Sequence, residues 1–219
     1  MTKEEYLQKL KEDSEFAPGW DAIDEEFARL YPGQEPYHFA TDIQKRAMFG
    51  GNQYLDGYSV YVNKDGYMHL VTYGMTELYG DEEAYGEEYS RWGYEMTMKI
   101  KGENPEDCIW AINVFSNLAR YTYESKRFYV AENCVPGNGK PLKLESDSLI
   151  TALITVDDTT AKGKDTVHGR VDFVQFVGIT ESELTAIRED ISNIGKLIEM
   201  MKKDNPLLIT DLDRKKSYL

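Results

Sequence analysis

The segment from Pro105 to Tyr123, PEDCIWAINVFSNLARYTY, constrains the fold more than any other part of the chain. Pro105 suits the first position of a helix, and Glu106 and Asp107 place negative charge at the positive end of the helix dipole. Apolar residues then recur at helical spacing and form one stripe: Cys108, Ala111, Ile112, Phe115, Leu118, Ala119 and Thr122. A helix this apolar must be covered from at least two directions, so we expect it to lie buried against a sheet.

The rest of this helix is only partly polar. Trp110, Val114 and Tyr121 form a second flank that is largely apolar. Polar residues are confined to one narrow ridge: Asn113, Ser116, Asn117 and Arg120. The ridge is either the helix's one route to water or a set of hydrogen bonds into the loops of the sheet. The second interpretation is favoured, because buried amides and arginines normally have partners.

The remaining periodic segments come in blocks, in the order helix, strands, helix, strands, helix. No strand and helix alternate in a βαβ series, so the pattern predicts an α+β fold with helices packed on a mixed or mainly antiparallel sheet. Helices are expected over 3–12, 18–30 and from Thr180 to Asn205, and strands over 36–40, 58–62, 67–73, 92–100, 149–156, 171–179 and 207–212. Loops are expected over 41–56 and 77–89, with a polar connector over 157–169.

Two of these strands differ in how they are expected to be covered. The strand over 67–73 is apolar on both faces, which predicts a central strand, and it follows a hairpin turn ending at Gly66. The strand over 92–100 alternates strictly, with Glu95, Thr97 and Lys99 on the polar side. That alternation predicts one face in water.

The last helix has a start signal and a stop signal. Thr180 and Glu183 form a capping box, and the pair Asn205-Pro206 ends the segment. Its apolar edge is Leu184, Ile187, Ile191, Ile194, Ile198 and Met201. The spacing predicts one continuous helix.

The charge balance restricts the partners. The 219 residues include 25 basic and 39 acidic ones, which gives a formal net charge of -14. That sign disfavours nucleic acid and anionic membranes, and it fits a soluble protein or one with a basic partner. The first residues are charged and lack a signal core, no apolar run is long enough to span a membrane, and Cys108 and Cys134 are too few for a disulfide framework. We therefore expect a cytoplasmic protein.

Catalytic and metal motifs are absent from the sequence. His38, His69 and His168 stand in no metal-ligand spacing, and no glycine-rich phosphate loop is present. We expect hydrogen-bonded histidines, no metal and no cofactor. The weakest hypothesis is a hydrolase, built on His69, Glu95 and Arg120 if the polar ridge of the central helix faces the polar side of the 92–100 strand.

The chain contains 16 tyrosines, and several cluster with acidic residues between the strands over 67–73 and 92–100. Tyrosine offers a large rigid contact area with one polar tip, as recognition surfaces require. The candidate partner-binding residues are Tyr79, Asp81, Glu82, Glu83, Tyr85, Glu87, Glu88 and Tyr89. These residues either clamp a basic peptide or protein face, or form a solvated loop whose tyrosines lie back on the core.

Eight segments, in order, resemble the Suppressor of fused (SUFU) domain family. They are PGWDAIDEEFARLYPGQEPYHFAT, LDGYSVY, HLVTYGMTELYG, WGYEMTMKI, WAINVFSNLARYTY, ITALITV, GRVDFVQFVGITESEL and NPLLITDL, and they run from Pro18 to Leu212. Two family motifs are altered: only His69 remains of an HWH motif, and Arg91 replaces the first glycine of an SGFGFE-like block. The resemblance implies a helical appendage over 1–16 and a SUFU-like domain over 17–219.

The resemblance also implies a function. It implies an α+β domain that binds proteins and catalyses no reaction; animal members hold a peptide of Gli transcription factors, and short bacterial members act as immunity proteins or antitoxins. Tyr79 matches a tyrosine of the animal peptide cleft, and Glu87 falls near an acidic position there. Our leading hypothesis is an immunity protein that binds a basic, often nuclease-type toxin encoded beside it. The alternative is a general peptide- or protein-binding module.

Overall fold

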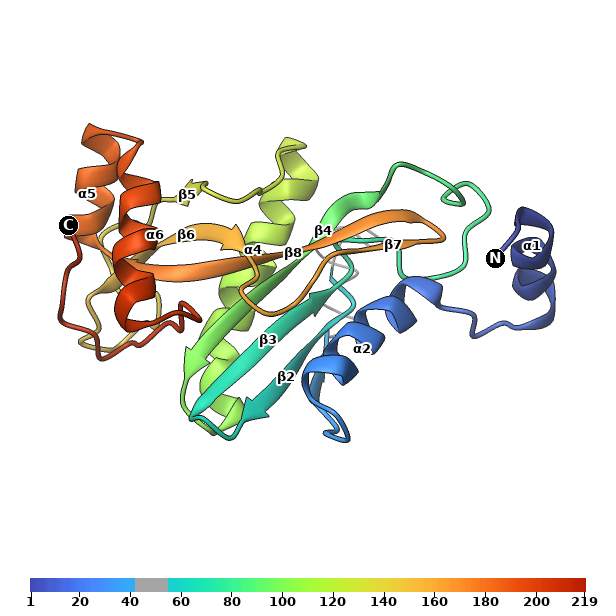
Figure 1. Cartoon of the computed structure of the whole chain (residues 1–219), viewed down its shortest axis with the longest axis horizontal. Helices are drawn as coiled ribbons and strands as arrows, with labels where there is room; N and C mark the ends of the chain where they lie inside the picture. The colour runs from blue at the N-terminus through green and yellow to red at the C-terminus, as the bar shows by residue number, and fades with distance from the viewer. Residues whose placement is uncertain (42–54) are drawn as a thin grey trace.

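The computed structural model describes residues 1–41 and 55–219 and contains one mixed sheet of eight strands with helices on both faces (Figure 1). The predicted α+β class is confirmed. The strand order is β1-β2-β3-β4-β8-β6-β5, with β7 paired to β8, and every pair is antiparallel except β4 and β8. The strands are β1 Tyr37–Ala40, β2 Gly57–Asn63, β3 Tyr67–Tyr73, β4 Tyr89–Lys101, β5 Cys134–Val135, β6 Ile150–Asp157, β7 Lys164–Thr166 and β8 Gly169–Thr180.

Helices cover the two faces of the sheet unequally. Helix α4 covers one face, while α2 and the pair α5 and α6 cover the other face at different ends (Figure 1). The described helical elements are α1 Lys3–Glu12, α2 Pro18–Leu30, the 3-10 helix η2 Pro105–Cys108, α4 Ile109–Ser125, α5 Glu181–Glu189 and α6 Asn193–Asp204. None of them is long and apolar enough to pass through a bilayer.

Helix α4 packs its apolar stripe on the sheet, as predicted, but Pro105–Cys108 forms a separate 3-10 turn and Tyr121 of the second flank is 43% exposed. Phe115 and Ala119 are completely buried against β3, β4 and β8, and burial raises the pKa of the Cys108 thiol to about 12, as expected for an inert cysteine. The polar ridge mainly faces water, since Asn113 and Asn117 are exposed. The favoured interpretation, hydrogen bonds into the sheet loops, was therefore wrong for these two amides.

The central hairpin confirms the prediction for the strand over 67–73. β2 and β3 are joined by a turn in which Gly66 has a φ of 81°, a conformation that favours glycine. Every residue of β3 is buried, because β2 and β4 flank it and helices cover both of its faces.

The prediction of a wet face on β4 was wrong. Glu95, Thr97 and Lys99 have no exposed surface. Alternation of polar and apolar residues does not distinguish water from a buried polar network, and here the polar side chains find partners inside the protein.

Asp158 is the centre of that network. It lies in the connector between β6 and β7, and its completely buried carboxylate accepts hydrogen bonds from Lys99 Nζ at 2.7 Å, His69 Nε2 at 3.0 Å and the Thr97 hydroxyl at 2.6 Å. Burial disfavours its ionised form, but His69 and Lys99 hold the pKa of this carboxyl well below its usual value. His69 is thus a hydrogen-bonded core histidine, as predicted, and the supposed polar connector supplies a core residue.

The C-terminal prediction needs three corrections. The expected single helix is two helices, because the chain turns between α5 and α6 and leaves Ile191 68% exposed rather than on the apolar edge. The expected strand over 207–212 is only an isolated bridge between Thr210 and Ile100. The capping box at Thr180 and Glu183 is confirmed.

The loop predicted over 41–56 lies almost entirely outside the described residues.

Replacing Asp158 by Asn is expected to lower the free energy of unfolding by about 3 to 5 kcal/mol, because the buried Lys99 ammonium then loses its counter-charge. The measurement is urea denaturation. Asp157→Asn is the matched control: Asp157 is the exposed neighbour, so its change is expected to stay within about 0.5 kcal/mol. Equal effects of the two substitutions would contradict the assigned role of Asp158.

The same network predicts a loss of stability in acid. As the pH falls below 3.8, the ordinary pKa of Asp, the unfolded chain binds a proton that folded Asp158 still excludes, so the stability that this group supplies above that pH is lost. Burial also lowers the pKa of His69, whose protonation in the unfolded chain begins to reduce stability below its ordinary value of 6.5. Unfolding free energies measured from neutral pH downwards are expected to fall less steeply below pH 3.8 in Asp158→Asn; parallel curves would argue against this assignment.

Candidate protein-binding surface

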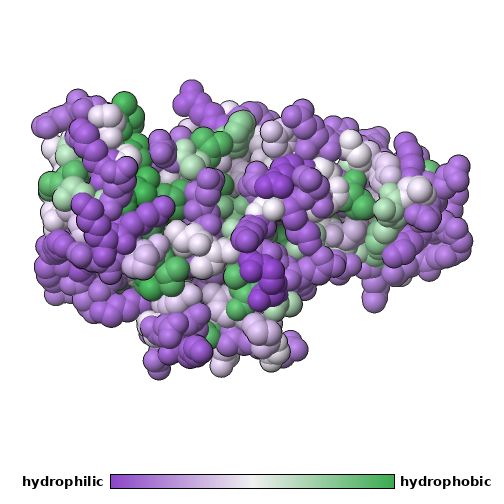
Figure 2. Space-filling model, in the orientation of Figure 1, coloured by the Kyte–Doolittle hydropathy of each residue, from purple (hydrophilic) through white to green (hydrophobic). Residues whose placement is uncertain are grey.

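The candidate surface is the segment Tyr79–Tyr89, which we call the acidic loop. It runs out from the sheet towards α1, at the opposite end of the molecule from α5 and α6 (Figure 1). Asp81, Glu82, Glu83, Glu87 and Glu88 are all exposed, as are Tyr79 at 48% and Tyr89 at 54%. Among the predicted residues, only Tyr85 is half-buried. The structure therefore brings the predicted set together on one exposed loop, in a molecule whose surface is mostly hydrophilic on the face that Figure 2 shows.

The approach to the acidic loop is fixed by a buried carboxylate. Glu95 accepts hydrogen bonds from the backbone N–H groups of Gly74, Met75 and Thr76 at 2.9 to 3.3 Å. The hydroxyls of Thr72 and Thr76 add two more, at 2.6 and 2.7 Å. Burial raises the pKa of Glu95, while these donors act to lower it. Five donors on one carboxylate hold the turn after β3 in a single conformation, and that turn sets where the loop begins.

The middle of the acidic loop is held by Tyr6 of α1. The Tyr6 hydroxyl donates to Asp81 O at 2.9 Å and accepts from the Asp81 N–H at 2.8 Å, and it lies 2.8 Å from His168 Nε2. Tyr6 is completely buried, although it is the only buried residue of a charged helix. The backbone at Asp81 is therefore fixed while its side chain stays exposed.

The end of the acidic loop is held by the turn between β7 and β8. The N–H of Gly86 donates to Val167 O at 2.9 Å, and the N–H of Arg170 donates to Glu88 O at 3.0 Å. A Cβ at Gly169 would lie 2.5 Å from Glu87 O, so a side chain there would push the two segments apart. Backbone contacts on three sides thus support a loop whose carboxylates face solvent.

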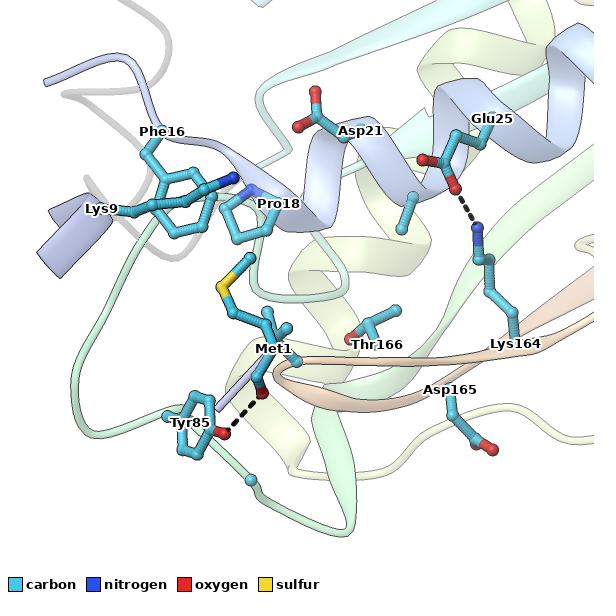
Figure 3. Close-up of a pocket in the computed structure, with 13 residues that line it drawn as sticks. Met1, Lys9, Phe16, Pro18, Asp21, Glu25, Tyr85, Lys164, Asp165 and Thr166 are labelled. Atoms are coloured by element: carbon cyan, nitrogen blue, oxygen red, sulfur yellow. Dashed lines mark hydrogen bonds and ion pairs between the residues drawn. The ribbon is translucent and has the colours of Figure 1, made fainter. Parts of the chain in front are cut away.

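Tyr85 joins the acidic loop to an open cavity of about 550 Å³ (Figure 3). Its ring lies 4.9 Å from the Tyr6 ring, and its hydroxyl donates to Met1 O at 3.0 Å. The cavity carries both charges, and Lys164 is paired with Glu25 at 2.6 Å. This cavity is too mixed in charge to explain selection of a basic partner, and it leaves the exposed carboxylates of the loop as the clearest recognition feature.

The role of α1 was underestimated from the sequence. The division into an appendage over 1–16 and a domain over 17–219 stays a prediction, but the contact with the domain is specific rather than loose. In the sequence, the only hints of this contact are Tyr6, a single aromatic residue in a charged helix, and Phe16. In the structure, the Phe16 carbonyl accepts a hydrogen bond from the Gly80 N–H at 2.9 Å. Sequence spacing gave no means of pairing Tyr6 with Asp81, 75 positions away.

The residues of the hydrolase hypothesis do not form a site. His69 and Glu95 are completely buried in separate hydrogen-bond networks, and Arg120 donates to Asn117 on the outer side of α4. None of the three lines the cavities of about 530 to 730 Å³ that lie beside Tyr85, Trp92, Trp110 and Tyr31. No group of three or more metal-ligating side chains occurs in that part of the chain either. His69, Glu95 and Arg120 therefore do not form the hydrolase site that the hypothesis required.

Comparison with known proteins confirms the family resemblance. A family model described as Suppressor of fused protein (SUFU) matches residues 51–215. The Suppressor of fused homolog of Homo sapiens is 30% identical over 213 residues, which cover 90% of this chain and 43% of the human protein. The chain thus spans less than half the length of this curated relative.

Two solved structures share the fold. A chain of the crystal structure of a Sufu–Fu complex superimposes with a TM-score of 0.76 at 23% identity, covering 92% of this chain and 93% of that one. A SUFU homologue from Neisseria gonorrhoeae superimposes with a TM-score of 0.61 at 13% identity, covering 92% and 97%. At these identities the two structures establish the fold of the domain.

Replacing Tyr6 by Phe is expected to release the middle of the acidic loop. The Asp81 N–H loses its acceptor, so its hydrogen exchange is expected to speed up about tenfold, and unfolding to become easier by about 1 to 2 kcal/mol. Hydrogen exchange measured by NMR reads out the first effect directly. Tyr37→Phe is the control, because Tyr37 lies exposed on the edge strand β1; an unchanged Asp81 exchange rate in Tyr6→Phe would refute the anchor.

Proposed function

The chain belongs to the Suppressor of fused protein family, and from this premise we propose that it is a non-enzymatic protein-binding domain whose acidic loop contacts a basic partner. The observation that carries the proposal is the combination of exposed carboxylates with a backbone pinned at Glu95, Tyr6 and the β7–β8 turn. A surface that is ordered before binding loses less conformational entropy when the partner docks. The proposal includes no metal, no cofactor, no nucleic acid and no membrane.

The finer proposal is an immunity or antitoxin protein. A nuclease-type toxin needs a basic surface for its own substrate, and an acidic loop on a chain of net charge -14 complements such a surface. The agreement in fold with the Neisseria gonorrhoeae homologue supports comparison with bacterial members. The expected partner is a toxin domain encoded beside this chain, and the inhibitor would meet it in the cytoplasm.

A second candidate is a general peptide- or protein-binding module without a toxin. The solved complex of Sufu with Fu supports it, since a domain of this fold there occurs with a protein partner. The two candidates differ in selectivity: an immunity protein binds one cognate domain tightly, whereas a general module binds several basic segments with similar affinity.

The test is co-expression and pull-down with the product of the adjacent reading frame. We expect that product to be toxic alone, to be bound by this chain and to be neutralised by it. The double reversal Glu87→Lys/Glu88→Lys is expected to slow association at low salt by about tenfold or more, because exposed charges act mainly on the rate of encounter. Glu189→Lys/Glu199→Lys, which makes the same net change at exposed sites on α5 and α6, is the matched control.

The outcomes separate the candidates. If the neighbouring product is neither toxic nor bound, the immunity proposal fails, and binding of assorted basic peptides would then favour the general module. If both double reversals slow association equally, net charge alone acts and the acidic loop is not the contact.

A further inference from the structure

An apolar groove of about 530 Å³ begins where the acidic loop ends. Tyr89 belongs to both features: it is the last residue of the loop and it lines the groove. Phe128 and Val130, in the segment that follows α4, line the same groove. The groove is lined mainly by Tyr89, Trp92, Tyr94, Phe128, Val130 and Val174.

Large apolar side chains are exposed along the walls of this groove. Phe128 is 57% exposed and Val130 is 49% exposed, and both line the groove. Large apolar side chains gathered around a hollow mark binding surfaces more often than isolated exposed ones do. The indole N–H of Trp92 is also buried without an acceptor among the described residues. The groove thus offers mainly apolar contact.

Charge around the groove favours a basic occupant. Arg91, Lys126 and Asp172 also line the groove. Arg91 is paired with Glu77 at 3.3 Å and Asp172 with Arg170 at 2.7 Å, while the Lys126 ammonium keeps its charge and lies 5.5 Å from the centre of the Trp92 ring. Asp157 lines the groove and is exposed, and Glu87 and Glu88 precede Tyr89 at the other end. Among the described residues, none forms an ion pair with these three carboxylates.

We propose that this groove takes one apolar, best an aromatic, side chain of the partner, from a segment whose neighbouring residues are basic. The proposal rests on the proposed protein-binding function and makes it more specific: the acidic loop attracts the segment, and the groove selects its central side chain. An aromatic ring suits the site because three aromatic residues, Tyr89, Trp92 and Phe128, line it and aromatic rings pack favourably against one another.

The test uses three capped peptides, GKKFKKG, GKKAKKG and GEEFEEG, titrated into the whole chain and followed by NMR. The Phe peptide is expected to bind about tenfold more tightly than the Ala peptide, because burying the ring removes apolar surface from water. The acidic peptide is expected to bind more weakly than either. Ala131→Trp, which places an indole in the groove, is expected to abolish the preference for Phe while leaving binding of GKKAKKG unchanged.

Leu144→Trp is the matched control, since Leu144 is exposed and lines a different cavity, beside α4. The control is expected to keep the preference for Phe. The groove proposal is wrong if Ala131→Trp also keeps that preference, or if GKKFKKG fails to bind at millimolar concentration. Equal affinity for the Phe and Ala peptides, with both weakened by Glu87→Lys/Glu88→Lys, overturns the groove and leaves the proposed function standing. Peptide binding that ignores this double reversal counts against the proposed function itself. Self-association that Ala131→Trp removes would instead assign the groove to a second copy of the chain.

Discussion

The buried carboxylate of Asp158 is the constraint on which the rest of this fold depends. It accepts hydrogen bonds from His69 of β3 and from Thr97 and Lys99 of β4. Without this carboxylate, the buried Lys99 ammonium would have no counter-charge and the Nε2 of His69 would lose its hydrogen-bond partner. The connector between β6 and β7 must therefore fold inward, and that path brings the β7–β8 turn to the acidic loop.

The residues that fix the acidic loop differ from the residues that are available to a partner. The groups that fix the acidic loop, which are Glu95, Tyr6 and the backbone around Gly169, are buried and use their hydrogen bonds internally. The groups available to a partner are exposed carboxylates and tyrosines that make few of those contacts. A substitution on the exposed side therefore changes what is bound with little change in fold, whereas a substitution on the buried side changes both.

The sequence predicted an element correctly where its local pattern of residues has a single structural explanation. The stripe of α4, the hairpin of β2 and β3 and the capping box at Thr180 follow from local spacing, and the structure shows all three. It failed for Lys99, because polar alternation has two causes, water and an internal network. It also failed for Tyr6 and Ile191, since a distant hydrogen bond and a change of helix direction leave no periodic signal. The candidate loop was found by composition, but the contacts that hold it were not.

The pairing of β4 with β8 contains a register shift between Tyr89 and Tyr94, where Arg91 and Gly93 both adopt positive φ. A shift of this kind absorbs extra residues locally, so the ladder beyond Tyr94 does not transmit what happens before it. The exposed side chains of the acidic loop can then change without disturbing the core. The bulge therefore uncouples the exposed side of the loop from the buried sheet, so side chains that face solvent there can be replaced without a change in strand pairing.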